Sequence, residues 1–185
     1  TDLNMCHNSG ITGEAAQQLA AVVLESVSLE VFSKVPIKQL RADALTELDL
    51  SQEGLGPTGG IVLAKLVGVS SVLTSLDIGW NDLDEQATLS IVRAARQQDK
   101  MTSLGLEGCG IGASGANEIA EYMRVSGVLT DLNLYVNSIG DEGAKSIASA
   151  LHVNSVLTIL DTRGNKIDCE AAQQLATAVL GSASL

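Results

Sequence analysis

Apolar residues recur along this chain at one fixed spacing. Counting from Leu132 as zero, apolar side chains stand at +2, +7, +15, +19 and +25, and Asn137 stands at +5. The same offsets recur every 28 residues, starting at Leu48, Leu76, Leu104 and Leu160. A period of this length indicates a repeat architecture, in which successive units share one local structure.

Each unit combines two periodicities. Its start alternates apolar and polar residues, which is typical of a short strand, and positions +11, +15 and +19 lie on one face of a helix. A single unit cannot bury its apolar stripe alone, so the units must stack on one another. The pattern therefore predicts an α/β solenoid arc, with parallel strands on the concave face and helices on the convex face.

We expect residues 1–185 to form one domain, with regular units near 1–28, 48–75, 76–103, 104–131, 132–159 and 160–185. The segment 29–47 is too short for a full unit. Because Pro36 forbids a helix across it, we predict a strand over 29–32 and a short helical turn near 38–42. The chain opens inside a strand and stops at a +25 position, which predicts a piece of a longer array. Its uncapped ends would allow end-to-end or homodimeric association.

Position +5 is predicted to carry a ladder of polar side chains along the stacked units. An Asn amide there can donate to the backbone of the next unit and accept from its own. The predicted ladder consists of Asn8, Asn81, Cys109, Asn137 and Asn165. Glu53 holds this position in one further unit, and an ionised carboxylate cannot donate. We therefore expect the ladder to break beside the irregular segment.

Composition narrows the classes of partner. The net charge is −11, which disfavours nucleic acid and anionic membrane surfaces and favours a basic protein partner. Aromatic residues make up only 2%, so the core must consist of Leu, Ile, Val and Ala. The three cysteines, Cys6, Cys109 and Cys169, are odd in number and lack a CxxC spacing, which predicts a reducing, cytoplasmic location. No apolar run approaches the length of a membrane span.

One stretch imitates a nucleotide-binding motif. Residues 54–59, GLGPTG, match the G-x-G-x-x-G fingerprint after a predicted strand. Residues 110–115, GIGASG, match it again two repeat lengths later, so the glycines belong to the repeat. The two histidines hold different repeat positions, and the acids of 82–85 sit at a helix start, where the helix dipole favours them. We therefore predict no cofactor, no metal and no enzymatic activity.

The strand face holds the strongest candidates for binding. If +0 and +2 point into the core, the residues at −1, +1, +3 and +4 line the concave surface. Acidic residues dominate there, and the face also carries one arginine and the only tryptophan. Exposed aromatic side chains among acids resemble binding hot spots. The predicted partner-binding residues are Trp80, Tyr135, Asp49, Asp77, Glu107, Asp131, Asp161 and Arg163. The alternative reading is that these acids only keep the sheet soluble.

The segment LTDLNLYVNSIGDEGAKSIASAL, residues 129–151, resembles the ribonuclease-inhibitor-like class of leucine-rich repeats. That class includes ribonuclease inhibitor, the sensing arrays of NOD-like receptors and the Ran GTPase-activating protein. The resemblance implies a curved scaffold that binds proteins, and Cys109 is a ladder substitution that the class allows. Glu53 and the irregular segment depart from the class pattern.

Three functions remain open from the sequence. The first is a non-catalytic scaffold whose acidic concave face binds a basic protein, with Trp80 and Tyr135 as anchors. The second is a GTPase-activating or regulatory scaffold that resembles the Ran regulator. The third is a structural spacer within a longer array.

Overall fold

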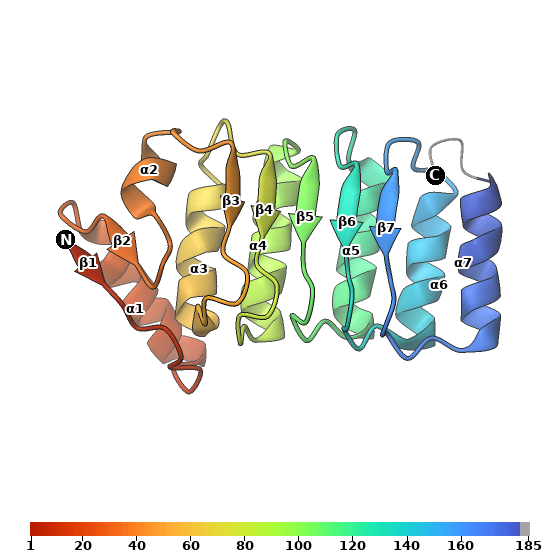
Figure 1. Ribbon diagram of the computed structural model, residues 1–185, viewed down its shortest axis with the longest axis horizontal. Coiled ribbons are helices and arrows are strands. Elements are labelled where there is room, and N and C mark those ends of the chain that lie inside the picture. Colours follow the sequence, from red (N-terminus) through yellow and green to blue (C-terminus); the bar gives the residue numbers. More distant parts are fainter. Residues whose placement is uncertain (182–185) are drawn as a thin grey trace.

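The chain alternates short strands with helices along its whole described length (Figure 1). The structure, a computed structural model, describes residues 1–181. The strands are β1 (Asp2–Leu3), β2 (Val31–Phe32), β3 (Glu47–Asp49), β4 (Ser75–Asp77), β5 (Ser103–Gly105), β6 (Asp131–Asn133) and β7 (Ile159–Asp161). The helices are α1 (Gly13–Glu25), α2 (Ile37–Arg41), α3 (Gly56–Val67), α4 (Glu85–Gln98), α5 (Ala113–Val125), α6 (Gly140–Leu151) and α7 (Cys169–Gly181). The end of the last predicted unit, 182–185, lies outside the described residues.

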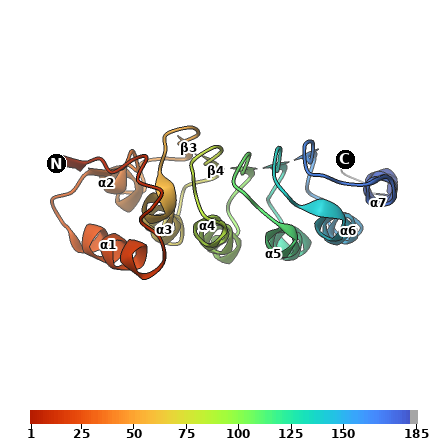
Figure 2. The same ribbon diagram turned by 90° about the horizontal axis from the view of Figure 1, so that it is seen from below.

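Strands β3 to β7 form one parallel sheet in sequential order. Each residue pairs with its equivalent in the next unit, so Leu48 lies opposite Leu76 and Leu132 opposite Leu160. The helices form a second layer on one side of the strands (Figure 2). This arrangement confirms the predicted α/β solenoid of parallel strands and covering helices. We call the uncovered side of the sheet the strand face.

The core lies between the two layers and consists almost entirely of aliphatic side chains. In the central units, the +0 and +2 residues are buried, as Leu76, Ile78, Leu132 and Leu134 show. The two large aromatic side chains in the core are Phe32 and Tyr122. Burial of this continuous apolar layer supplies the main driving force for stacking the units.

The +5 side chains join consecutive units, but in the direction opposite to the predicted one. Asn137 donates to Leu106 O of the preceding unit at 2.8 Å and to Leu134 O of its own unit at 3.1 Å, and its Oδ1 accepts from Ile111 N at 2.9 Å. Asn81 and Asn165 make equivalent bonds. The amide thus bonds to the preceding unit and not to the next one. The loop of the preceding unit offers one backbone N–H and one backbone carbonyl that this amide pairs with.

The other +5 residues depart from this pattern. Cys109 donates its thiol weakly to Ile78 O of the preceding unit at 3.6 Å. Asn8 is exposed and donates only within its own unit, to Met5 O and Cys6 O. Glu53 instead pairs with Lys34, with 3.7 Å between Oε2 and Nζ. The side chain of Glu53 therefore faces the irregular segment.

Two further ladders, which the apolar pattern did not predict, run parallel to the asparagines. At −2, the hydroxyls of Thr74, Thr102, Thr130 and Thr158 each donate to the carbonyl of the threonine 28 residues earlier, at 3.0 to 3.2 Å. At +22, Ser126 accepts from Leu129 N, and Asn154 accepts from Leu157 N, where the chain returns to the next strand. Both positions recur in the sequence, but a search for apolar periodicity passes over their polar side chains.

The irregular segment divides the strands into two sheets. Strand β2 pairs with β1 only, and β3 begins the second sheet. The strand is two residues shorter than predicted, and α2 starts one residue earlier, directly after Pro36. Because α2 has only five residues, α1 packs directly against α3. The guanidinium of Arg41 donates to Leu24 O and Ser26 O and so caps the end of α1.

Within residues 1–181, no helix has the length and apolar character that crossing a membrane requires.

Replacing Asn137 by Ala should lower the free energy of unfolding by about 2–4 kcal/mol, because buried backbone groups in two units lose their partners. Asn8→Ala should cost less than about 1 kcal/mol, since Asn8 is exposed and joins no two units. Urea denaturation followed by circular dichroism measures both values. Equal losses for the two variants would contradict the role of the buried amides.

The buried ladder thiol should be unreactive in the native protein. Burial raises the pKa of Cys109 to about 12, so the fraction of reactive thiolate at pH 8 is very small. A variant with Cys6→Ser and Cys169→Ser retains Cys109 alone. Its thiol should react with Ellman's reagent only after urea is added, and rapid labelling without urea would contradict the buried position.

Candidate functional site

An acidic groove runs across the strand face from β3 to β6. It encloses about 330 Å³, and four carboxylates line it, those of Glu47, Asp49, Asp77 and Asp131. The remaining lining residues of the groove are uncharged, so no lysine or arginine among the described residues balances these acids there. We call these four residues and the space between them the acidic groove. Its composition favours a positively charged ligand.

Two of these carboxylates also stabilise the chain bend that follows each strand. Asp49 Oδ1 accepts from Ser51 N at 2.9 Å, and Asp77 Oδ1 accepts from Gly79 N at 2.8 Å. The bonds from Ser51 hold the pKa of Asp49 below its ordinary value. In two other units an asparagine makes the same bond: Asn4 accepts from Cys6 N and Asn133 from Tyr135 N. The apolar pattern does not reveal this turn-capping role at +1, although the recurrence of Asp and Asn at that position indicates it.

The other two carboxylates of the groove have no such role. Within residues 1–181, neither the Glu47 carboxylate nor that of Asp131 accepts a hydrogen bond or pairs with a cation. Glu47 is exposed and Asp131 is half-buried. Because the fold makes no use of these two charges, they are the groove members most available to a ligand.

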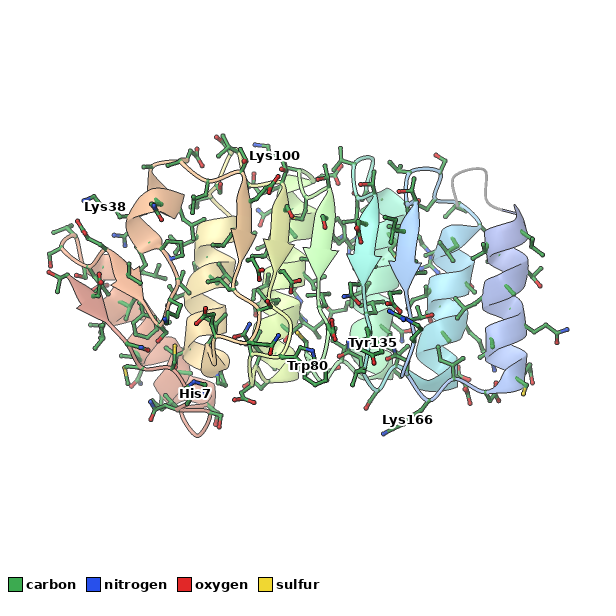
Figure 3. All side chains as sticks on the ribbon, viewed as in Figure 1. His7, Lys38, Trp80, Lys100, Tyr135 and Lys166 are labelled. Carbon is green, nitrogen blue, oxygen red and sulfur yellow. The ribbon has the colours of Figure 1, made fainter. Side chains whose placement is uncertain are left out.

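Trp80 lies at the carboxyl end of β4, where Figure 3 labels it, and its side chain is 45% exposed. A Cβ placed on Gly108 of the next unit would clash with the six-membered part of the Trp80 ring. The indole therefore lies flat against the Gly108 backbone. A large aromatic surface held in this way loses little conformational freedom when a partner covers it.

The backbone at Trp80 is held in a conformation that side chains disfavour. Its φ is 56°, in the left-handed region. The +4 residue of every other full unit also has a positive φ; these residues are His7, Gln52, Gly108, Val136 and Gly164. The left-handed conformation costs a non-glycine residue roughly 1–2 kcal/mol. Two units have glycine at this position, and glycine adopts a positive φ without strain. Trp80 adopts it with a bulky side chain and therefore bears the strain.

Tyr135 and its neighbours form a separate cluster at the carboxyl ends of β6 and β7 (Figure 3). The Arg163 guanidinium lies 5.1 Å from the centroid of the Tyr135 ring. Its Nε also donates to the Asp161 carboxylate at 3.0 Å, and this arginine holds the pKa of Asp161 below its ordinary value. Arg163 thus covers Tyr135 and neutralises Asp161.

Glu107 is half-buried, and in the sequence it lies between Trp80 and Tyr135. Its Oε2 accepts from Asn133 Nδ2 at 3.4 Å. Of the eight residues predicted to bind a partner, the structure thus brings Asp49, Asp77 and Asp131 into one groove. Trp80 stands exposed at the end of β4, and Tyr135, Asp161 and Arg163 contact one another instead. Glu47 joins the groove although it was not among the eight.

The other chemical candidates have structural explanations. The His7 ring lies over Gly54, the first glycine of the GLGPTG stretch, and so blocks the approach of a phosphate to its backbone. Asp84 Oδ1 accepts from Ala87 N at 2.7 Å and caps α4. Among the described residues, no three His, Cys, Asp or Glu side chains form a group that could hold a metal ion.

Comparisons with known proteins support the architecture. A family model described as leucine-rich repeat matches residues 69–85 and 128–148. No curated protein matches the sequence. Two similar solved structures are "Leiomodin-1 Actin-Binding Site 2 (ABS2)" and the tropomodulin C-terminal domain of Caenorhabditis elegans.

The two structural matches cover most of the chain. The leiomodin-1 structure has a TM-score of 0.68 and 15% identity, covering 80% of this chain and 87% of its own. The tropomodulin domain has a TM-score of 0.66 and 12% identity, covering 78% and 89%. The chain therefore has the fold of leucine-rich repeats, whereas the ribonuclease-inhibitor-like subclass stays a prediction.

Replacing Gly108 by Ala should displace the Trp80 ring, because the added Cβ would occupy the space of the indole. Trp80 is the only tryptophan, so its emission reports on this site alone. We expect a red-shifted emission maximum and stronger quenching by acrylamide. Gly110→Ala is the matched control, since Gly110 also has a positive φ but open space around it. The same spectral change in both variants would contradict the stacking of Trp80 on Gly108.

Proposed function

We propose that this protein is a non-catalytic scaffold that binds the basic segment of a protein partner on its strand face. The observation that carries the proposal is the acidic groove, in which four carboxylates meet without a balancing cation. Lysine or arginine side chains of a partner would supply the missing charge. Such complementarity sets the specificity and speed of association more than the affinity itself.

Trp80 would supply the apolar part of the contact. One side of its ring already packs against Gly108, so a partner can cover the exposed part of the ring. The carboxylates of the acidic groove would orient the basic segment. Tyr135 would contribute less to binding than the sequence predicts, because Arg163 already covers its ring.

Similar structures support a protein as the ligand. The leiomodin-1 structure is named as an actin-binding site, so this fold binds a protein in that case. At 15% identity, the resemblance does not identify the partner of this chain. The net charge of −11 favours a basic protein over nucleic acid, which carries the same sign of charge.

The proposal can be tested by removing the groove charges while keeping the turns intact. The groove variant combines Glu47→Gln, Asp49→Asn, Asp77→Asn and Asp131→Asn. Asparagine suits positions 49 and 77 because Asn133 makes the same turn bond. In affinity capture from native cell extract at low salt, this variant should retain basic proteins about tenfold less than the wild type. Moderate salt should release them from the wild type.

The matched control removes four carboxylates from the helices, with Glu14→Gln, Glu25→Gln, Glu121→Gln and Glu142→Gln. It has the same net charge as the groove variant, and all four residues lie outside the groove. Once a partner is captured and purified, its titration should change the emission of Trp80. Equal losses of binding in the groove variant and the control would show nonspecific attraction and overturn the proposal.

A further inference from the structure

A second groove lies on the opposite side of the molecule, between α1, α3 and α4. It encloses about 740 Å³ and is separated from the strand face by the whole core. Figure 2 shows these three helices side by side on the far side from the strands. None of its lining residues belongs to the acidic groove, so the two sites are independent of one another.

The floor of this helix groove is apolar. Small side chains from all three helices form it, namely Ala20, Ala64 and Ala94, and they leave room between the helix axes. Leu24 and Ile61 are half-buried at its edges, and Val69 at its end is 69% exposed. An apolar surface of this kind gains free energy when a partner covers it.

The groove is a consequence of the irregular segment. Because α2 has only five residues, no full helix stands between α1 and α3. In Figure 1, α1 is also tilted relative to the parallel row of helices from α3 to α7. The α1 surface therefore meets α3 at an angle, and the space between them opens toward solvent.

The charged side chains that line the groove are basic, although the protein as a whole is acidic. Lys65 and Arg93 are the only charged side chains that line it, in a chain whose net charge is −11. Glu118 binds the Arg93 guanidinium through Nε at 2.8 Å and Nη2 at 2.6 Å, so that side chain has a defined position. Among the described residues, Lys65 forms no ion pair.

The groove between α6 and α7 provides a contrast. It encloses about 400 Å³, and most of its lining residues are of polar types, Glu170 and Lys145 among them. A charge of each sign therefore lines that groove, and it selects neither kind of ligand. The groove at α1 instead combines an apolar floor with Lys65, which has no ion-pair partner among the described residues, whereas Glu118 offsets the charge of Arg93.

We infer that the groove between α1, α3 and α4 binds an amphipathic helix of a protein partner, with leucine-like residues on one side and carboxylates beside them. The floor takes the apolar side, and Lys65 takes a carboxylate. A helix suits the site because the groove walls are helices, which present side chains and no free strand edge to the partner.

The test uses a fluorescent peptide of about 14 residues, which spans about 21 Å as a helix. Its leucines recur every third or fourth position, and glutamates flank them. We expect half-saturation in the micromolar range by fluorescence anisotropy, and about tenfold weaker binding to Lys65→Glu. Ala21→Tyr, an exposed position in the wall of the groove, should block binding as well.

The matched control is Lys145→Glu, which makes the same charge change on α6 and should leave binding unchanged. A peptide with lysines in place of the glutamates should bind poorly to the wild type and better to Lys65→Glu. This reversal of preference between the acidic and the basic peptide cannot result from a loss of stability in Lys65→Glu. Failure of the acidic peptide to bind, or equal effects of Lys65→Glu and Lys145→Glu, would overturn the inference. Self-association that Ala21→Tyr abolishes in sedimentation would assign the groove to a second copy instead and also overturn it.

Discussion

The fold depends on hydrogen bonds between equivalent positions of neighbouring units. Each strand has only two or three residues, so the sheet alone leaves many backbone groups in the bends and returns without partners. Asn at +5 donates to and accepts from backbone groups of the preceding unit, Thr at −2 donates to a carbonyl of that unit, and Asn154 at +22 donates to Met123 O there. Leaving such groups buried and unpaired would cost about 1–3 kcal/mol each. The repeat length of 28 residues therefore reflects these polar side chains as well as the leucines.

This constraint also organises the strand face. The bend after the strand has a left-handed residue at +4 in every full unit and a side-chain acceptor at +1 in all of them except the unit of Gly105. The acidic groove takes two of its carboxylates from these capping positions. Negative charge on this face is thus partly a by-product of turn formation. Glu47 and Asp131 are the members that the turns do not require, since within residues 1–181 neither carboxylate accepts a hydrogen bond or pairs with a cation. The same distinction separates Trp80, which stays exposed, from Tyr135, which Arg163 covers.

The sequence was sufficient for the fold because one pattern recurs in almost every unit. The order of strand and helix, the parallel register and the inward +0 and +2 positions all follow from the apolar period alone. The site was harder to predict. The offsets correctly brought Asp49, Asp77 and Asp131 to one face, but they carry no information on which acids are hydrogen-bonded. The pairing of Arg163 with Asp161 depends on rotamers, and the resting of Trp80 on Gly108 depends on the path of the loop. The groove beside α1 arises where the period fails, so no argument from the period could find it.

The break in the sheet between β2 and β3 gives the two parts of the chain different cooperativity. Residues before β3 join the rest through α1 and α2 on α3, through the Asp43 carboxylate, which accepts from Ser70 and Ser71, and through a bond from His7 N to Gly54 O. They lack the strand ladder that joins the later units. In a linear array, stability is the sum of unit and interface terms, and the weakest interface opens first. The boundary before β3 is therefore the place where we expect this array to open first, although one continuous core crosses it. Because α1 forms one wall of the helix groove, a helix bound there would hold the two parts together.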